Sequence, residues 1–276
     1  MEAQDFPAKL NQIYELYQLD KISEAMDELN KLQVDLESYP LLVQLTQDYH
    51  RIQTVYNMFN DTEDWVVENS TGPVRILYKK VPDTPTYSIL CESTLPIPLF
   101  NFLSLIYETD SYPSWMPFCV DSEVLQSISR SRKVVRISSS VGPYKREVCM
   151  EGYGANLLLK EGAVMIVCKS LEDSKADQLY HTKKTRSEVT MFGCLIRPIG
   201  KDSISVKVIS NFDPKIKFLP YKLLNFFMRK LAKTIFNKIT EKAANLDPEK
   251  FQNPLNRDFY NHINESLKEF FDRHKI

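Results

Sequence analysis

Glycine is scarce in this chain: only 7 of its 276 residues are glycine. Folds that bind phosphate on a glycine-rich loop are disfavoured, because such loops need several glycines at fixed spacing. The segment Gly152-Tyr153-Gly154 is a lone G-x-G without the later glycine of a dinucleotide fingerprint. The G-x-S-x-G and H-E-x-x-H motifs are also absent from the sequence. These absences argue against nucleotide-binding enzymes and two common classes of hydrolase.

Histidine is scarce as well, with 4 residues, and none has a cysteine or acid nearby at metal-ligand spacing. We therefore expect no metal, no cofactor and no catalytic residue. An enzyme stays open as a less favoured alternative, because one fold can support different chemistries.

The five cysteines are isolated in the sequence, and none forms a C-x-x-C pair. Their odd number and their scatter favour free thiols and a reducing compartment. No apolar stretch approaches the roughly 18 residues of a membrane span. The acidic start lacks the pattern of a secretory signal, and neither end carries a lipidation motif. We expect a cytoplasmic protein.

The overall charge is close to neutral, with a formal net charge of −1. A neutral chain has no general attraction for nucleic acid, so we expect no nucleic-acid partner. Any attraction to a membrane surface must come from local patches.

The first 60 residues have helical periodicity. Apolar residues recur every three or four positions from Leu10 to Leu36 and again from Leu42 to Phe59, after Pro40. We interpret residues 1–39 as an N-terminal helical extension that packs on the main domain. The alternative is a module that docks a protein partner.

After Trp65 the pattern becomes that of strands and hairpins. A short apolar helix is expected over 98–107, a long helix over about 219–246 with Pro220 in its first turn, and a last helix over 255–271. Between them lie short runs rich in β-branched and aromatic residues, which favour an antiparallel sheet. These runs are 74–81, 86–92, 123–128, 133–141, 146–153, 163–171, 187–197 and 203–211.

The order of elements and several local motifs resemble the START family of lipid-transfer domains. In that family a Trp precedes the first strand, a short helix pair ends in Trp, and an N-x-D-P segment followed by L-P leads into the last long helix. The matching residues here are Trp65, Leu95-Pro96-Ile97-Pro98-Leu99-Phe100, Tyr112-Pro113-Ser114-Trp115-Met116-Pro117, Asn211-Phe212-Asp213-Pro214, Leu219-Pro220 and Asn225-Phe226-Phe227-Met228-Arg229-Lys230-Leu231.

The resemblance implies an α+β helix-grip fold, in which a curved antiparallel sheet wraps around a long C-terminal helix. It implies a START-like domain over residues 40–276, including an extra helix at about 247–276. It also implies a non-catalytic function: one lipid (phospholipid, sterol or ceramide-like) is held in a hydrophobic tunnel under the helix and carried between membranes.

The long helix is predicted to line the tunnel through Leu224, Phe227, Leu231 and Ile235, which share one helix face. Ordinary core packing is the alternative for each of these residues. Residues 211–242 carry eight basic and two acidic side chains, a local charge of +6 in a chain of −1. This basic helix predicts transient contact with an anionic membrane through Lys222, Lys230 and Lys233, although a solvated helix face is the alternative.

The strands supply the remaining candidates. Leu157, Leu158 and Leu159 are predicted to touch the membrane at the tunnel mouth, or else to continue a strand buried on both faces. Met165 and Met191 are expected to line a permissive tunnel. Arg136 and Arg197 are candidate polar anchors, although outward-facing charges are the alternative. The family's sterol binders carry a buried acid–base pair; the lack of an obvious pair here argues against a sterol and leaves a phospholipid or another acyl-chain lipid open.

A second function is kept beside lipid transfer. The N-terminal helices could dock a protein partner, so that the domain acts as a lipid-regulated adaptor. Deleting residues 1–37 would distinguish the two functions: a docking module predicts that lipid transfer survives while localisation is lost.

Overall fold

The computed structural model describes residues 5–61, 63–68, 73–82, 84, 86–215, 220–246 and 253–275. At positions 5, 221, 222, 224, 225, 228 and 229 it describes the backbone alone. None of the described helices is both long enough and apolar enough to cross a membrane.

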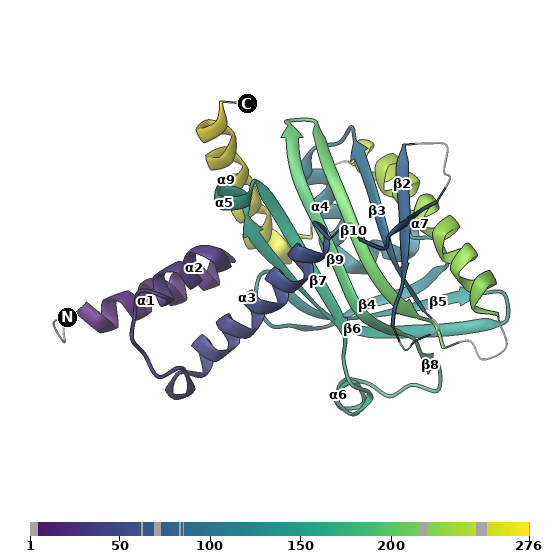
Figure 1. The fold of residues 1–276 in the computed structure, drawn as a ribbon, viewed down its shortest axis with the longest axis horizontal. Coiled ribbons are helices and arrows are strands. Elements are labelled where there is room, and N and C mark those ends of the chain that lie inside the picture. The colour runs from purple at the N-terminus through teal and green to yellow at the C-terminus, as the bar shows by residue number, and fades with distance from the viewer. Residues whose placement is uncertain are drawn as a thin grey trace.

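A curved sheet of ten strands forms the centre of the molecule (Figure 1). Its order is β1-β2-β3-β10-β9-β7-β6-β5-β4, with antiparallel neighbours throughout, while the short β8 pairs in parallel with β6. In chain order the strands are β1 (Val66–Val67), β2 (Val74–Lys80), β3 (Tyr87–Leu95), β4 (Cys119–Ser127), β5 (Arg132–Val141), β6 (Tyr144–Leu157), β7 (Ala163–Ser170), β8 (Thr185–Arg186), β9 (Glu188–Gly200) and β10 (Ser203–Asp213).

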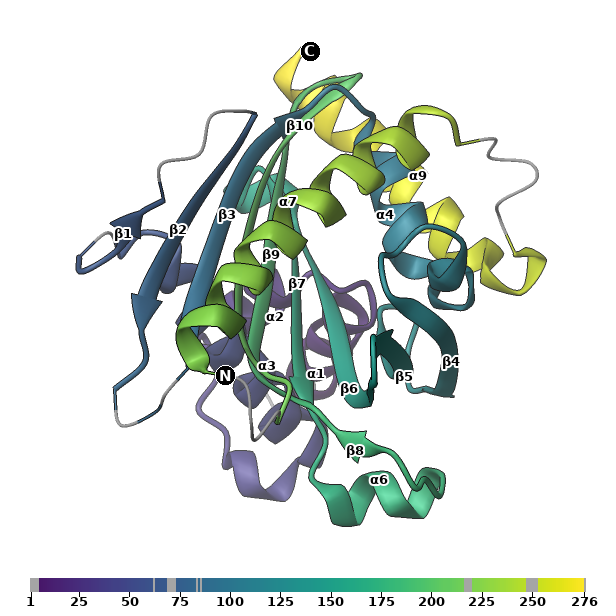
Figure 2. The same ribbon diagram turned by 90° about the vertical axis from the view of Figure 1, so that its right-hand side faces the viewer.

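Three helices cover one face of the sheet, with a 3₁₀ segment, η2 (Thr109–Ser114), beside them. They are α4 (Leu99–Tyr107), α7 (Tyr221–Ala244) and α9 (Arg257–His274), the last preceded by η3 (Pro254–Asn256). Figure 2 shows α7 lying across the strands with α4 and α9 beside it. Phe236 and Ile239 of α7, Phe102 of α4, and Phe259 and Ile263 of α9 belong to one buried apolar cluster on this face.

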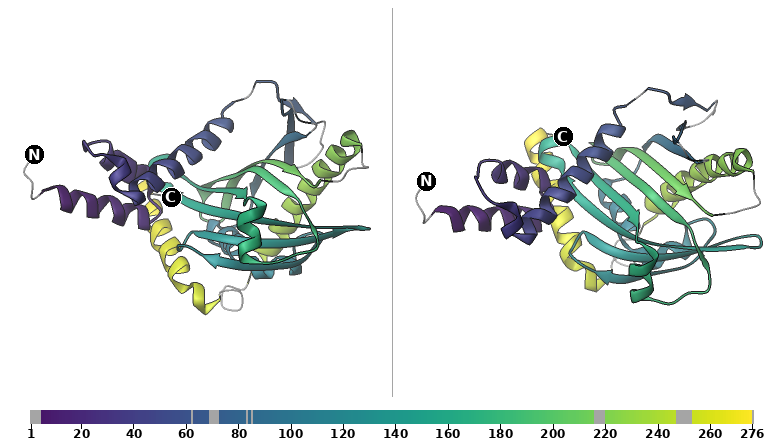
Figure 3. Two further views of the ribbon diagram at one scale, coloured as in Figure 1. Left: turned by 90° about the horizontal axis from the view of Figure 1, so that it is seen from below. Right: turned by 60° about the horizontal axis from the view of Figure 1, so that its bottom comes forward.

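The N-terminal helices cover the opposite face (Figure 3). They are α1 (Asp5–Gln18), α2 (Ile22–Leu29) and α3 (Pro40–Met58), with η1 (Leu36–Ser38) leading into α3. Ile13, Ile22, Leu42 and Ile52 are fully buried in a second apolar cluster, which also contains sheet residues such as Leu195. All three helices therefore share one core with the sheet, and the boundary at residue 39 stays a prediction.

A buried ionic network joins α1 and α3 to the sheet. The guanidinium of Arg132 on β5 pairs with the carboxylate of Asp48 on α3, and both side chains are less than 10% exposed. The hydroxyl of Tyr17 on α1 donates to the same carboxylate, and Arg132 also contacts Glu151 Oε1 at 3.3 Å. Removing one partner of such a pair would leave an uncompensated buried charge, so the network fixes the helices on the sheet.

The central strands have two apolar faces because helices cover both sides. Along β7, Val164 and Ile166 point to the cluster under α7, whereas Met165 and Val167 point to the cluster under the N-terminal helices. This follows from the period of two along a strand. It explains why these strands have nearly continuous apolar runs instead of alternating apolar and polar residues.

Two short helices were not expected from the sequence. The polar segment 172–184, between two of the expected strands, contains α6 (Asp173–Leu179), and α5 (Leu158–Glu161) follows β6 directly. Gly162 ends α5 with φ of +61°, a left-handed conformation that suits glycine at a helix C-terminus.

Candidate functional site

A cavity lies between the sheet and α7, and its larger part encloses about 280 Å³. We call this part the apolar lobe. Its walls come from β3, β5–β7, β9, β10, α4 and α7, together with η2 and the segment that follows it. Representative lining residues are Phe102, Trp115, Ile137, Phe192, Val208 and Ile235. Such a concave, mostly apolar site is the usual form of a small-molecule site.

The part of α7 from Leu231 to Ile239 forms one wall of the apolar lobe. Leu231 and Ile235 line the lobe, as do Ala232, Phe236 and Ile239, all within three turns of the helix. This result agrees with the placement predicted for Leu231 and Ile235. No ligand role is tested by it.

The N-terminal half of α7 presents large apolar side chains to solvent. Leu223, Phe226 and Phe227 are 43%, 39% and 51% exposed. The ammonium of Lys230, one turn later, lies 4.5 Å from the centre of the Phe226 ring. Phe227 therefore does not line the cavity as predicted; among the α7 side chains that the structure describes, the first to line it is Leu231.

Some of the residues predicted on α7 cannot be placed. The side chains of Leu224 and Lys222 lie outside the described ones. Lys230 is exposed, as a membrane contact would require, whereas Lys233 is half-buried. The membrane role of this helix stays a prediction.

A second part of the cavity, which we call the polar lobe, encloses about 130 Å³. It lies among α4, β5–β7 and α9, and its lining includes Asp20, Ser131, Lys133, Asn156 and His262. The two lobes share five lining residues, so they adjoin inside the molecule. The shared residues are Ile106, Tyr112, Met150, Ile166 and Cys168.

Aromatic rings and one lysine form a wall of the polar lobe. The rings of Tyr107 and Phe259 stack with their centres 3.6 Å apart, which joins α4 to α9. The ammonium of Lys133 lies 3.2 Å from the centre of the Tyr107 ring, a cation–π contact. Burial lowers the pKa of Lys133 to about 8, while Glu108 and Asp110 oppose that shift.

Two other titratable groups of the polar lobe have shifted pKa values. Burial lowers the pKa of His262 to about 4, with the positive charges of Arg130 and Lys21 acting in the same direction. Burial raises the pKa of Asp20 to about 6, although Ser131 and Arg130 stabilise its carboxylate by hydrogen bonds and charge. Both shifts have desolvation as their main cause.

Three thiols also line the apolar lobe: Cys91, Cys168 and Cys194. Burial raises the pKa of Cys91 and of Cys168 to about 12, and raises that of Cys194 further. Because the thiolate is the reactive form, these cysteines behave as small apolar side chains at neutral pH.

The two methionines predicted to line the tunnel lie on the other side of the sheet. Met165 is fully buried in the cluster under the N-terminal helices, and Met191 packs against that cluster. The prediction that these methionines line the tunnel is therefore wrong. Side chains alternate between the two faces of a strand, so their neighbours Ile166 and Phe192 line the apolar lobe instead.

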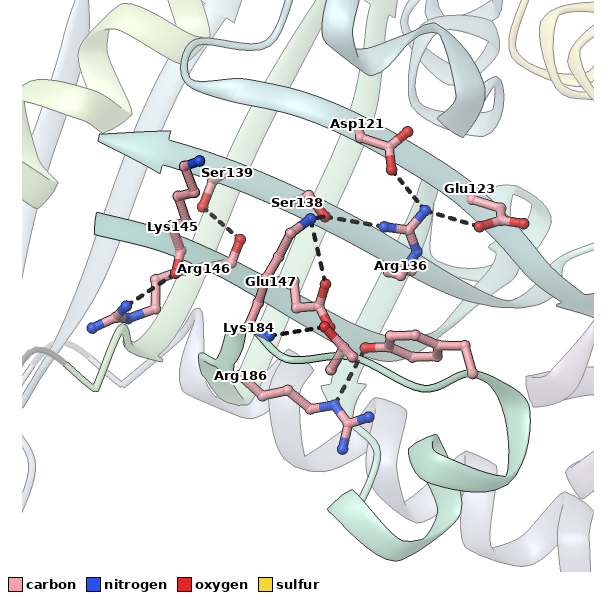
Figure 4. Close-up of polar contacts among 12 residues, drawn as sticks. Asp121, Glu123, Arg136, Ser138, Ser139, Lys145, Arg146, Glu147, Lys184 and Arg186 are labelled. Carbon is pink, nitrogen blue, oxygen red and sulfur yellow. Dashed lines mark hydrogen bonds and ion pairs between the residues drawn. The ribbon is translucent and has the colours of Figure 1, made fainter. Parts of the chain in front are cut away.

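The two arginines proposed as polar anchors also face away from the cavity. Arg136 pairs with Asp121 and Glu123 at 2.7 and 2.9 Å, in a charged cluster over β4–β6 that also includes Glu147 and Lys184 (Figure 4). Arg197 donates to the hydroxyl of Tyr56 on α3 at 2.9 Å. Neither arginine contacts the described lining, so both are outward-facing charges or contacts of the N-terminal helices.

The three leucines predicted to touch a membrane are mostly inside the fold. Leu157 and Leu158 are 0% and 2% exposed, and Leu159 is half-buried. Leu157 faces the N-terminal helices and Leu158 faces the α7 side, because β6 ends there and α5 begins. Because Leu157 and Leu158 are buried, the prediction that they contact a membrane is wrong.

Lys133 and His262 are two of the polar lining residues that the sequence did not reveal, together with Asp20, Ser131 and Asn156. Lys133 stands in a strand whose neighbours Val134 and Val135 are both buried. Such a run does not show which face of the sheet meets α9. His262 shares an α9 face with Phe259, but histidines at helical spacing are common in ordinary cores.

No protein-family model matches the chain, and a comparison with curated protein sequences found no match either. Solved structures do share the fold. Human STARD10 superposes with a TM-score of 0.64 at 18% identity, covering 74% of this chain and 82% of its own. Human StAR-related lipid transfer protein 5 superposes with a TM-score of 0.63 at 14% identity, covering 71% and 94%.

A bacterial protein shares the fold as well. A STAR-related lipid transfer protein from Xanthomonas axonopodis superposes with a TM-score of 0.55 at 14% identity, covering 66% of this chain and 99% of that fragment. The sheet, the α7 helix laid across it and these superpositions agree with the architecture expected from the sequence. The chain therefore has the helix-grip α+β fold of START domains.

Proposed function

We propose that this protein binds one lipid in the cavity under α7 and carries it between membranes without chemical change. The observation that carries the proposal is the apolar lobe itself, a cavity lined by aliphatic and aromatic side chains where α7 crosses the sheet. The solved neighbours in the START fold that are named as lipid transfer proteins support the same function.

Release of a lipid needs an exit that can meet a bilayer. The N-terminal half of α7 fits this need, because Leu223, Phe226 and Phe227 are exposed beside the basic Lys230. Exposed apolar side chains next to basic ones are typical of helices that bind at a membrane interface. The β5–β6 turn lies at the same end of the molecule (Figure 1), and Val141 there is 48% exposed.

The test is native mass spectrometry of the purified full chain, followed by extraction and identification of what is released. A stoichiometric adduct that extracts as an intact lipid supports a carrier. A protein that is empty and takes up no lipid from mixed vesicles would overturn the proposal. An adduct that is converted to a product on incubation would move the function to an enzyme.

The adaptor stays a second proposal and needs a different experiment. The N-terminal helices use their apolar faces against the sheet, so a partner would have to bind their outer surface. Substituting outward-facing residues such as Leu19 and Leu41, which are 40% and 38% exposed, leaves that core intact. Loss of a bound protein with lipid transfer unchanged would support the adaptor.

A further inference from the structure

Most polar groups of the polar lobe already have partners within the protein. The Asn156 amide donates to Ser266 Oγ at 2.9 Å, and its carbonyl accepts from the backbone N–H of Leu158 at 3.2 Å. The Asp20 carboxylate accepts from the Ser131 hydroxyl and pairs with Arg130 at 3.5 Å. The hydrogen bonds and the ion pair of these groups fix α9, α5 and the α1–α2 turn.

Three polar groups of the described lining residues have no such partner: Lys133 Nζ, His262 Nε2 and the Tyr153 hydroxyl, the last on a side chain that packs in the cluster under the N-terminal helices. Among the residues that the structure describes, Lys133 Nζ has neither a hydrogen bond nor an ion pair, and its recorded contact is the Tyr107 ring. His262 is 8% exposed, and its Nε2 atom is buried with no hydrogen-bond partner in the described part of the chain. An uncompensated buried polar atom is costly and unusual in a native fold, which points to a ligand that supplies the missing partner.

The acids around Lys133 do not supply that partner. Glu108 Oε1 accepts hydrogen bonds from the Asn253 backbone, the Asn256 amide and the Tyr260 hydroxyl, so this oxygen is occupied by the start of α9, and Glu108 acts on Lys133 only through its charge. Asp110 acts on Lys133 only through its charge, and Asp20 is paired with Arg130. A cation in a mostly apolar space favours a negatively charged partner there.

We propose that the polar lobe binds the anionic head group of the lipid, a phosphate or carboxylate, through the Lys133 ammonium and a hydrogen bond from His262 Nε2. This inference rests on the proposed lipid carrier. The apolar part of the lipid then occupies the apolar lobe, which adjoins the polar lobe through Ile106 and Ile166. A neutral hydroxyl in the same place would leave the half-buried ammonium with no anionic group in contact, since Glu108 and Asp110 act on it only through their charge, so acidic lipids are preferred by about tenfold.

The test is competition between matched lipids. The full chain is incubated with phosphatidylcholine vesicles that contain phosphatidate, diacylglycerol, oleic acid and oleyl alcohol at equal mole fractions. It is then separated from the vesicles, and the adducts are weighed by native mass spectrometry. Enrichment of phosphatidate over diacylglycerol identifies a phosphate, and enrichment of oleic acid over oleyl alcohol identifies a carboxylate.

Variants then assign the preference to the lobe. Lys133→Gln is expected to lose the preference for acidic lipids, while Lys133→Arg retains it. Lys169→Gln on β7 is the matched control, because it removes the same charge from an exposed position outside the cavity. Lys133→Met replaces the glutamine variant if that variant does not fold.

The possible failures are distinguishable. If the wild-type chain takes up no lipid at all, the carrier function itself fails. If it takes up acidic and neutral lipids equally, or if Lys133→Gln keeps the preference, the head-group site is overturned and the carrier function stands.

Discussion

Gly193 on β9 lies directly against the side chain of Val55 on α3, leaving no room for a β-carbon between them. The Ile209 methyl group on β10 would also lie 3.2 Å from such an atom, so the site is closed on two sides. Here α3 of the N-terminal helical layer packs tightly on the sheet, and the contact depends on glycine having no side chain.

Gly193→Ala is expected to destabilise the protein by about 1 to 3 kcal/mol, because an added methyl group in a packed core forces neighbours to move. Chemical denaturation of the full chain measures this change. Combining it with Val55→Ala should recover part of the loss, since that change removes the methyl group in the way. Equal stability of Gly193→Ala and wild type would mean that α3 does not sit on β9 as described.

His262 should make the protein less stable in acid. Its pKa is lowered from about 6.5 to about 4 in the fold, so the unfolded state binds more protons between these values. Its contribution is present above pH 6.5 and is lost as the pH falls toward 4. Asp20 in the same lobe has its pKa raised to about 6 and acts in the opposite direction, while Arg130, Lys21 and Asp258 set the local charge.

The two effects are separated by comparing wild type with His262→Gln. Between pH 7 and pH 5 the wild type is expected to lose about 1 to 2 kcal/mol more unfolding free energy than the variant, after allowance for solvent screening. Denaturation at both pH values measures this difference. If both proteins lose the same amount, the histidine is not buried in its neutral form.

Chemical modification of the three cysteines that line the apolar lobe measures whether lipid occupies it, without a labelled lipid. After lipid is stripped, an apolar maleimide is expected to modify Cys91, Cys168 and Cys194 slowly, because burial raises their pKa values. Loading with lipid should suppress the modification further, since all three line the apolar lobe.

Cys149 is the internal control for this experiment. It is 2% exposed but packs with Val134 and Ala176, outside the lining of either lobe. Peptide mapping by mass spectrometry should show protection of the three cavity thiols and no change at Cys149. Equal protection of all four would indicate general tightening of the fold instead of a ligand in the lobe.

The sequence was sufficient to predict the architecture but only part of the site. Strand periodicity and the apolar stripe on α7 predicted the strands and the long helix, and the resemblance to START domains implied that this helix covers the sheet. The apolar stripe also predicted that Leu231 and Ile235 share the helix face that lines the cavity. These features are local, so they can be seen in a single chain.

The errors came from properties that depend on tertiary contacts. Phe227 shares a face with Leu231, yet helical period does not reveal where along the helix the wall of the cavity begins. Met165 and Ile166 must face opposite sides of β7, but both sides are apolar because helices cover both. Only the packed structure shows that the methionine faces the N-terminal helices. The polar lobe likewise depends on α9 meeting β5, a contact between distant segments.

One pair of substitutions tests whether Leu231 lines the cavity while Phe227 lies on the outer surface of α7. Leu231→Glu is expected to reduce lipid occupancy at least about tenfold, because it places a charge in the apolar lobe at a cost of several kcal/mol. Phe227→Glu should fold and retain lipid, since its side chain is 51% exposed. It should nevertheless slow transfer between vesicles, because it puts a negative charge on the surface proposed to meet the bilayer.

Native mass spectrometry measures occupancy, and transfer of a fluorescent lipid between vesicles measures the rate. Circular dichroism of both variants establishes that each is folded, so that a loss of lipid is not a loss of structure. The reverse result, an empty Phe227→Glu and a loaded Leu231→Glu, would place the cavity wall at the N-terminal half of the helix. Equal transfer by Phe227→Glu and wild type would instead leave the lobe assignment intact and remove this end of α7 from membrane contact.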